Sequence, residues 1–396
     1  MNEYYRADVL HCHELRDKLD SFTGSPKADW LKRDELLKNL IVTSDKTFLF
    51  EQSHCLSLEL LKLRLEKLGK NALTTINALE NYCDRLWTYV GENETWEFWP
   101  EESHPYETVS NIYKDEYGHN STKFLLADLK RLIRTPEPNI DLWYADNVQH
   151  FDVESHLEAL VTITRVPLDK CFFPADYNKL LRELFFKLKA TPRRKVDLLY
   201  KIGSLYPVFF ECRELAHSLF EEARQTTLSH FGKDHPLLCK WYERMAEYER
   251  EHGTYEQGAR YAEACAELWL GNDETLHAAR SYCLQGFLDR HAGNTVKAAK
   301  ALVKALKLGD SETHLQVSYD LDAIQMCPYG RDKAHLRLES EQLSWLANEL
   351  DIILDTLPDN TEEGYKAFRS LSFTEAKLRW PLAPSEAKSK LTGLLS

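Results

Sequence analysis

The sequence predicts an all-α protein whose C-terminal half is an α-solenoid, and three observations support this fold class. Only 15 Gly and 14 Pro occur among 396 residues, and this shortage of turn residues disfavours an all-β fold. Long stretches place apolar residues three and four positions apart, the spacing of a buried helix face. After residue 192, tyrosines and small residues recur at intervals of 42 and then 40 residues, which is typical of stacked helix pairs.

The N-terminal region, residues 1–190, is expected to be helical but irregular. Residues 48–69 carry leucines at helical spacing and end at Gly69, where a C-terminal glycine cap belongs. Residues 71–91 show the same periodicity, so the two segments predict a helical hairpin. Proline-bearing pieces separate further predicted helices at 121–134, 153–164 and 174–188.

Residues 92–120 are rich in acidic, aromatic and turn-forming residues, and they predict a long irregular loop that could hold one short helix. Its large aromatic side chains and those at its border are Trp87, Trp96, Trp99, Tyr106, Tyr113 and Tyr117. Two interpretations stay open, because exposed aromatic rings are costly. The loop either docks back over the helices or forms a binding element that a partner orders.

The repeats are predicted over residues 194–350, after a linker in which Arg193, Arg194 and Lys195 are expected to be solvated. A capping helix is expected to close the array, and residues 358–396 are expected to form a partly ordered tail. Five sets of positions keep one register: Tyr200, Tyr242 and Tyr282; Tyr206, Tyr248 and Leu288; Ala216, Gly258 and Ala298; Phe220, Ala262 and Leu302; Ala223, Cys265 and Ala305. Each unit is therefore a helix, a turn and a second helix, whose small residues allow close packing.

Residues 231–268 resemble a tetratricopeptide repeat of the 42-residue kinesin-light-chain type. The resemblance lies in the head formed by Gly232, His235 and Pro236 and in the turn at Gly253 and Tyr255. Residues 279–308 resemble the generic repeat in their second helix. The resemblance implies an array of tetratricopeptide-like hairpins that serves as an interaction scaffold, with a concave groove lined by the first helix of each hairpin.

Composition narrows the classes of partner. Fifty Lys plus Arg against 63 Asp plus Glu leave a net charge of −13, which disfavours nucleic acid. The nine cysteines are scattered without a C-x-x-C pattern, so we expect reduced thiols and neither a metal nor a cofactor. The charged N-terminus and the lack of a long apolar run predict a cytoplasmic protein that does not insert into membranes.

We expect a protein-interaction adaptor that binds a peptide or partner helix in the concave groove. The residues predicted to line this groove are Lys201, Leu205, Phe209, Glu243, Glu247, Glu251, Arg280, Phe287 and His291. Cys283 lies on the same predicted helix face. Glu243, Glu247 and Glu251 stack along one helix face and repel one another, and a basic segment of the partner could neutralise them. The competing interpretation is a solvated face that nearby Lys and Arg neutralise.

Two other function classes stay open. A regulator could sense a short peptide or a small molecule through a change in curvature of the array. An enzyme is disfavoured because none of the searched catalytic motifs occurs. A Cys/His pair assembled only in three dimensions would nevertheless escape a motif search.

Overall fold

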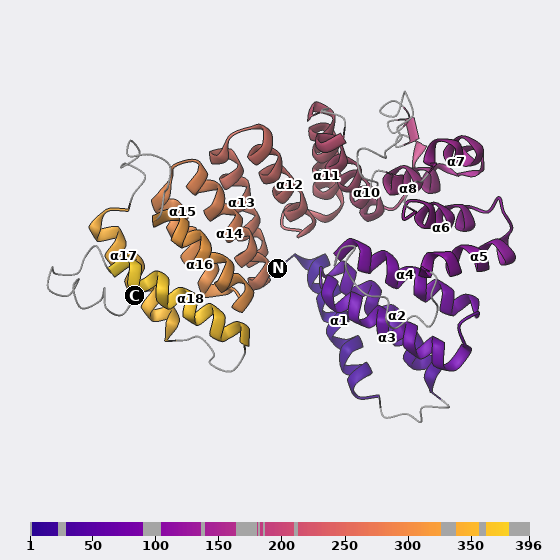
Figure 1. Cartoon of the computed structure of the whole chain (residues 1–396), viewed down its shortest axis with the longest axis horizontal. Coiled ribbons are helices and arrows are strands. Elements are labelled where there is room, and N and C mark those ends of the chain that lie inside the picture. Colours follow the sequence, from indigo (N-terminus) through magenta and orange to yellow (C-terminus); the bar gives the residue numbers. More distant parts are fainter. Residues whose placement is uncertain are drawn as a thin grey trace. The chain divides into compact units, whose positions relative to one another are not determined.

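The computed structural model describes residues 2–22, 29–89, 104–135, 139–163, 180, 183–184, 187–209, 213–325, 338–355 and 362–379. The chain divides into two compact units, residues 3–213 and residues 214–396 together with the first two residues. Every regular element in the described ranges is a helix, as Figure 1 shows. The all-α prediction is therefore confirmed.

The first unit is a succession of helices in which α1 to α6 each pack against the next. The elements are α1 (Glu3–Asp20), α2 (Trp30–Lys46), α3 (Phe50–Leu68), α4 (Leu73–Tyr89), α5 (Pro105–Tyr117), α6 (Thr122–Leu132), α7 (Ile140–Asn147), the short 3-10 helix η1 (Val148–His150), α8 (Val153–Ile163) and α10 (Pro192–Phe209). The apolar stripes of α1 to α6 meet in one core that includes Leu37, Leu61, Leu79 and Tyr106.

The helices predicted from periodicity in this unit are present. Helix α3 ends at Gly69, whose φ of 79° is the left-handed conformation that favours glycine. Helix α6 begins after Ser121, whose side chain accepts a hydrogen bond from the backbone N–H of Phe124. Most of the helix predicted at 174–188 lies outside the described residues.

The expected loop at 92–120 contains a full helix, α5, and the loop prediction is wrong for residues 105–117. Tyr106, Val109 and Tyr113 follow one another at helical spacing and are buried in the core. Pro105 occupies the first helical position, where its missing N–H costs nothing. Docking is thus confirmed for Tyr106 and Tyr113, whereas the side chains of the three tryptophans lie outside the described part.

The basic residues before the array are anchored, which corrects the expected solvated linker. Arg193 donates to the backbone oxygen of Lys46 at 3.1 Å and lies over the ring of Phe48. Arg194 forms ion pairs with Glu154 and Glu158 on α8. These contacts hold α10 in the first unit, although the repeat pattern pairs it with α11.

A buried ion pair joins α2 to α3. Arg64 Nε lies 2.5 Å from Asp34 Oδ1, and Arg64 Nη2 donates to Asp34 Oδ2 at 3.1 Å. Arg64 also donates to the backbone oxygen of Thr74, which anchors the first turn of α4. Burial by itself would raise the pKa of Asp34, but the hydrogen bonds from Arg64 and Lys38 outweigh burial and lower the pKa below its usual value.

The second unit continues the chain of helices from α11. Its elements are α11 (Arg213–Phe231), α12 (Leu237–His252), α13 (Tyr255–Leu270), α14 (Thr275–His291), α15 (Thr295–Leu308), α16 (Ser311–Gln325), α17 (Ser340–Leu354) and α18 (Glu362–Arg379). Helices α12 to α16 each pack against the next. The small and apolar repeat positions of α11, α13 and α15 are all buried: Ala216, Phe220, Ala223, Gly258, Ala262, Cys265, Ala298, Leu302 and Ala305.

In each of two successive hairpins, the two helices are in close contact at a pair of small residues. A methyl group placed on Gly258 of α13 would lie 3.2 Å from the backbone oxygen of Ala246 on α12. A methyl group placed on Gly286 of α14 would lie 3.3 Å from the backbone oxygen of Ala298 on α15. The two pairs are 40 residues apart in the sequence, with glycine and alanine exchanged. The helix backbones therefore approach closely at equivalent points.

The expected tail contains a packed helix, α18, which contacts α16 and α17. Ala367, Leu371, Thr374 and Leu378 are buried along one side of it. Their spacing of four, three and four residues is that of a helix face, with a threonine at one of the buried positions. Residues 380–396 lie outside the described part.

Arg64→Met should destabilise the chain by about 3 kcal/mol at neutral pH, because it leaves Asp34 buried with less compensation. The pKa of Asp34 is lower in the folded than in the unfolded state. The ion pair therefore stabilises the folded chain at pH values above the ordinary aspartate pKa, and this stabilisation is lost as the pH falls through the folded-state pKa. The destabilisation measured by urea unfolding should therefore shrink below about pH 4. Arg33→Met is the control, because Arg33 pairs with Glu59 on the exposed surface, and should cost less than about 1 kcal/mol.

Gly286→Ala should destabilise the chain by about 1–3 kcal/mol, because its methyl group would lie 2.6 Å from two carbons of the buried Leu302. Gly271→Ala has only ordinary contacts and should be neutral or slightly stabilising. Combining Gly286→Ala with Leu302→Ala should cost less than the sum of the two single changes. Strict additivity in thermal or urea unfolding would contradict the proposed close contact.

Candidate functional site

The residues predicted to line the groove lie on α10, α12 and α14. The side chains of Lys201, Leu205 and Phe209 on α10 lie outside the described part of the structure. The other predicted residues are described, and they belong to the second unit.

The three glutamates of α12 have different surroundings. Glu243 is half-buried against α13, with the Cys265 thiol 3.8 Å from its carboxylate, and burial raises its pKa. Glu247 forms an ion pair with Arg244 at 2.6 Å, and Glu251 forms one with Arg250 at 3.1 Å. Glu247 and Glu251 are thus each paired with an arginine of their own helix, whereas Glu243 is not.

The predicted residues of α14 fall into two groups. Arg280 is exposed and lies 3.9 Å from Glu312 on α16. Phe287 and His291 pack together, with ring centroids 4.4 Å apart, and His291 stacks on Tyr255 from the start of α13. Burial and the nearby Arg290 charge lower the pKa of His291, so its imidazole is neutral at pH 7. Phe287, His291 and Tyr255 form a half-exposed aromatic cluster.

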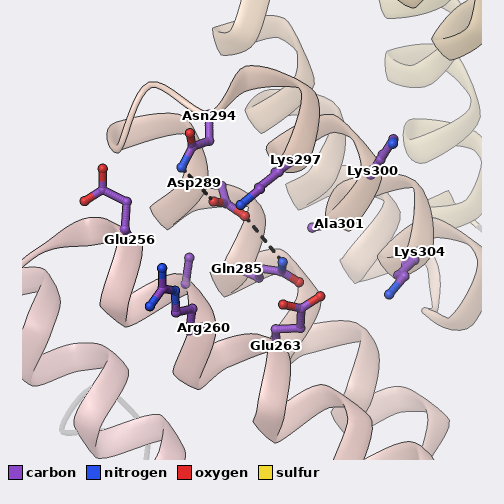
Figure 2. Close-up of a pocket in the computed structure, with 11 residues that line it drawn as sticks. Glu256, Arg260, Glu263, Gln285, Asp289, Asn294, Lys297, Lys300, Ala301 and Lys304 are labelled. Carbon is purple, nitrogen blue, oxygen red and sulfur yellow. Dashed lines mark hydrogen bonds between the residues drawn. The ribbon is translucent and has the colours of Figure 1, made fainter.

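A pocket of about 250 Å³ lies on another side of α14, between α13 and α15 (Figure 2). Gln285 and Asp289 of α14 lie two residues away from Phe287 and His291 respectively, which turns them by about 200° around the helix. The lining residues are Glu256, Ala259, Arg260 and Glu263 from α13, Gln285 and Asp289 from α14, Asn294 from the following turn, and Lys297, Lys300, Ala301 and Lys304 from α15.

The two walls of the pocket carry opposite charge. Helix α13 contributes Glu256 and Glu263 with Arg260 between them, whereas α15 contributes three lysines at intervals of three and four residues. These intervals place each set on one side of its helix. At one end the walls meet, because Lys304 Nζ lies 3.4 Å from Glu267 of α13.

The floor of the pocket is polar and almost fully buried. Asp289 is 3% exposed, and its two carboxylate oxygens accept long hydrogen bonds from Gln285 Nε2 at 3.3 Å and Asn294 Nδ2 at 3.4 Å. Gln285 is 7% exposed, and its Oε1 has no hydrogen-bond partner within the described structure. Burial raises the pKa of Asp289, and the bonds from Asn294 and Gln285 offset only part of this effect.

Another cluster of interacting titratable groups joins α4, α5 and α6 in the first unit. Lys130 forms ion pairs with Glu80 at 2.9 Å and Asp84 at 2.7 Å. Tyr106 donates to Asp84, and Tyr113 donates to Glu80. Burial alone would lower the pKa of Lys130, but the two carboxylates outweigh it and raise the pKa. Because these groups satisfy one another, we assign the cluster to helix packing.

Among the described residues, no group of three or more His, Cys, Asp or Glu side chains could hold a metal ion. A search of the same residues finds no helix with the length and apolar character that a membrane crossing requires. The buried thiols of Cys239 and Cys265 each approach the other's backbone oxygen, and burial raises the pKa of Cys239.

No known protein family matches the sequence, and a comparison with curated proteins finds no significant similarity.

Sequence reasoning missed the pocket, although both walls are visible in the sequence. Lys297, Lys300 and Lys304 have the spacing of one helix side, as do Glu256 and Glu263. What the sequence does not show is that α13 and α15 flank α14 with these sides turned toward the same space.

The raised pKa of Asp289 predicts a pH-dependent effect of Asp289→Asn. The folded state holds the aspartate proton more tightly than the unfolded chain, so ionising Asp289 costs stability as pH rises from the ordinary pKa through the folded value. The melting temperature of the variant minus that of the wild type should therefore increase above about pH 4 and then level off. A difference that stays constant with pH would contradict the buried carboxylate.

Proposed function

We propose that the chain is a protein-interaction scaffold whose second unit is an array of tetratricopeptide-like hairpins holding a peptide or a partner helix. The observation that carries the proposal is the repeated small-residue contact, Ala246 with Gly258 and Gly286 with Ala298, at a spacing of 40 residues. Equivalent close contacts in successive hairpins are what a stacked repeat array requires. Such arrays present a continuous surface to extended partners.

The peptide is proposed to lie along the first helices of the hairpins, α12 and α14. Glu247 and Glu251 supply surface negative charge there, and each has one arginine neighbour. The aromatic cluster around Phe287 supplies a rigid apolar contact of the kind that carries much of the energy in interfaces. A partner with a basic residue next to an apolar one would match both features. A cytoplasmic location, expected from the sequence, belongs to the same proposal.

Random peptides displayed on phage and selected on the immobilised full chain should yield a shared motif that contains a basic and an apolar residue. A synthetic peptide with this motif should bind Glu247→Lys/Glu251→Lys at least about tenfold more weakly, a loss of about 1.4 kcal/mol. Both glutamates are surface residues paired within their own helix, so the core should stay intact.

The matched control is Glu14→Lys/Glu35→Lys on α1 and α2, two exposed glutamates outside α12 and α14, which changes the net charge by the same amount. The control should bind the peptide with less than a threefold change, about 0.7 kcal/mol. Equal weakening in both variants would show only a long-range charge effect. Failure to enrich any motif would count against the scaffold itself.

A further inference from the structure

The walls of the α13–α15 pocket carry charges that the described structure leaves unpaired. Glu256, Arg260 and Glu263 on α13 and Lys297 and Lys300 on α15 form no ion pair or hydrogen bond with any described residue. Opposite charges face the same space, yet only Lys304 reaches across, to Glu267. A ligand with a cationic and an anionic group could complete both walls at once.

The floor of the pocket presents hydrogen-bond acceptors, so it favours a ligand group that donates hydrogen bonds. The buried Gln285 Oε1 has no hydrogen-bond partner among the described residues, and the amide nitrogen of the same side chain donates to Asp289. An acceptor buried without a partner costs about 1–3 kcal/mol, and Asp289 beside it is a carboxylate with only two long hydrogen bonds. Both residues line the pocket, so a donor group inside it lies next to this floor.

We propose that this pocket binds an arginine side chain of a partner peptide, while an adjacent acidic residue of the same peptide binds Lys297 and Lys300. The guanidinium group offers five N–H donors in a planar fork. These donors can satisfy Gln285 Oε1 and the Asp289 carboxylate together, with Glu263 as a further acceptor on the wall. A volume of about 250 Å³ falls below that of pockets for drug-sized ligands and matches a single side chain.

This second site goes beyond the proposed scaffold function. Gln285 and Asp289 lie on a different side of α14 from Phe287 and His291, because positions two residues apart differ by about 200° around a helix. The two binding events can therefore be tested separately, and loss of one does not imply loss of the other.

The probe is the capped tetrapeptide Gly-Arg-Asp-Gly, titrated into the full-length ¹⁵N-labelled chain. The readout is the side-chain amide resonances of Gln285 and Asn294, which are assigned by their disappearance in Gln285→Leu and Asn294→Asp. We expect saturable shifts of these resonances. Capped Gly-Gln-Asp-Gly lacks the positive charge and should bind at least about tenfold more weakly, because it loses charged hydrogen bonds to the floor. Capped Gly-Arg-Asn-Gly lacks the negative charge and should bind about threefold more weakly, because a surface ion pair contributes less.

Exposed wall residues provide variants that should fold normally. Glu263→Gln and Lys300→Gln should each weaken binding about threefold, within the range of surface charge contacts. Lys307→Gln is the matched control, because Lys307 lies on the same helix but pairs with Glu349 at 2.7 Å outside the pocket. It should leave the affinity unchanged, and the melting temperature of every variant is recorded alongside.

Three results would overturn the proposal. Equal affinity for Gly-Gln-Asp-Gly would make the site an anion site without an arginine pocket. Equal weakening by Lys307→Gln would reduce the effect to general charge. Saturable shifts confined to resonances other than those of Gln285 and Asn294 would place the peptide elsewhere.

Discussion

The close contact of neighbouring helices at small residues is the constraint on which the second unit depends. Gly258 brings α13 against α12, and its missing methyl group also leaves room for Leu288 of α14 at 3.3 Å. Gly286 brings α14 against α15 in the same way. Helix α14 is thereby packed between α13 and α15, whose charged sides line the same pocket. The pocket exists because the backbones that form its floor pack so tightly.

The sequence predicted the features that recur at regular positions along the chain. The small-residue positions and the glycine caps could be identified because helix packing requires a particular residue size or backbone angle there. At most one short helix was expected where α5 lies, because acidic and turn-forming residues around Tyr106 and Tyr113 masked the helical spacing of these rings. In α18 a buried threonine, Thr374, interrupts the apolar stripe. Both helices are stabilised by packing against distant segments, which local patterns do not encode.

The candidate site was harder to predict than the fold. A repeat pattern indicates which positions are buried, but Gln285 and Asp289 are polar residues at buried positions, and their role depends on which neighbours face them. The lysines of α15 and the acids of α13 are more than thirty residues apart in the sequence. Only the arrangement of α13, α14 and α15 shows that they line one space, while the resemblance directed attention to another side of α14.

The pocket treats buried charge differently from the ion pairs found elsewhere in both units, such as that of Arg290 with Asp320, and this contrast supports a binding role for the pocket. In the first unit, Asp34 is paired with Arg64, and Lys130 with Glu80 and Asp84, so buried charges are compensated within the chain. In the pocket, Asp289 accepts two long amide hydrogen bonds and has the Lys297 charge nearby, but no described residue forms an ion pair with it, and the buried Gln285 Oε1 has no hydrogen-bond partner among the described residues. A packing role would be met at lower free energy by apolar side chains at both positions. Polar groups left uncompensated at the floor of a cavity whose walls carry unpaired charge are better explained by a ligand that completes them.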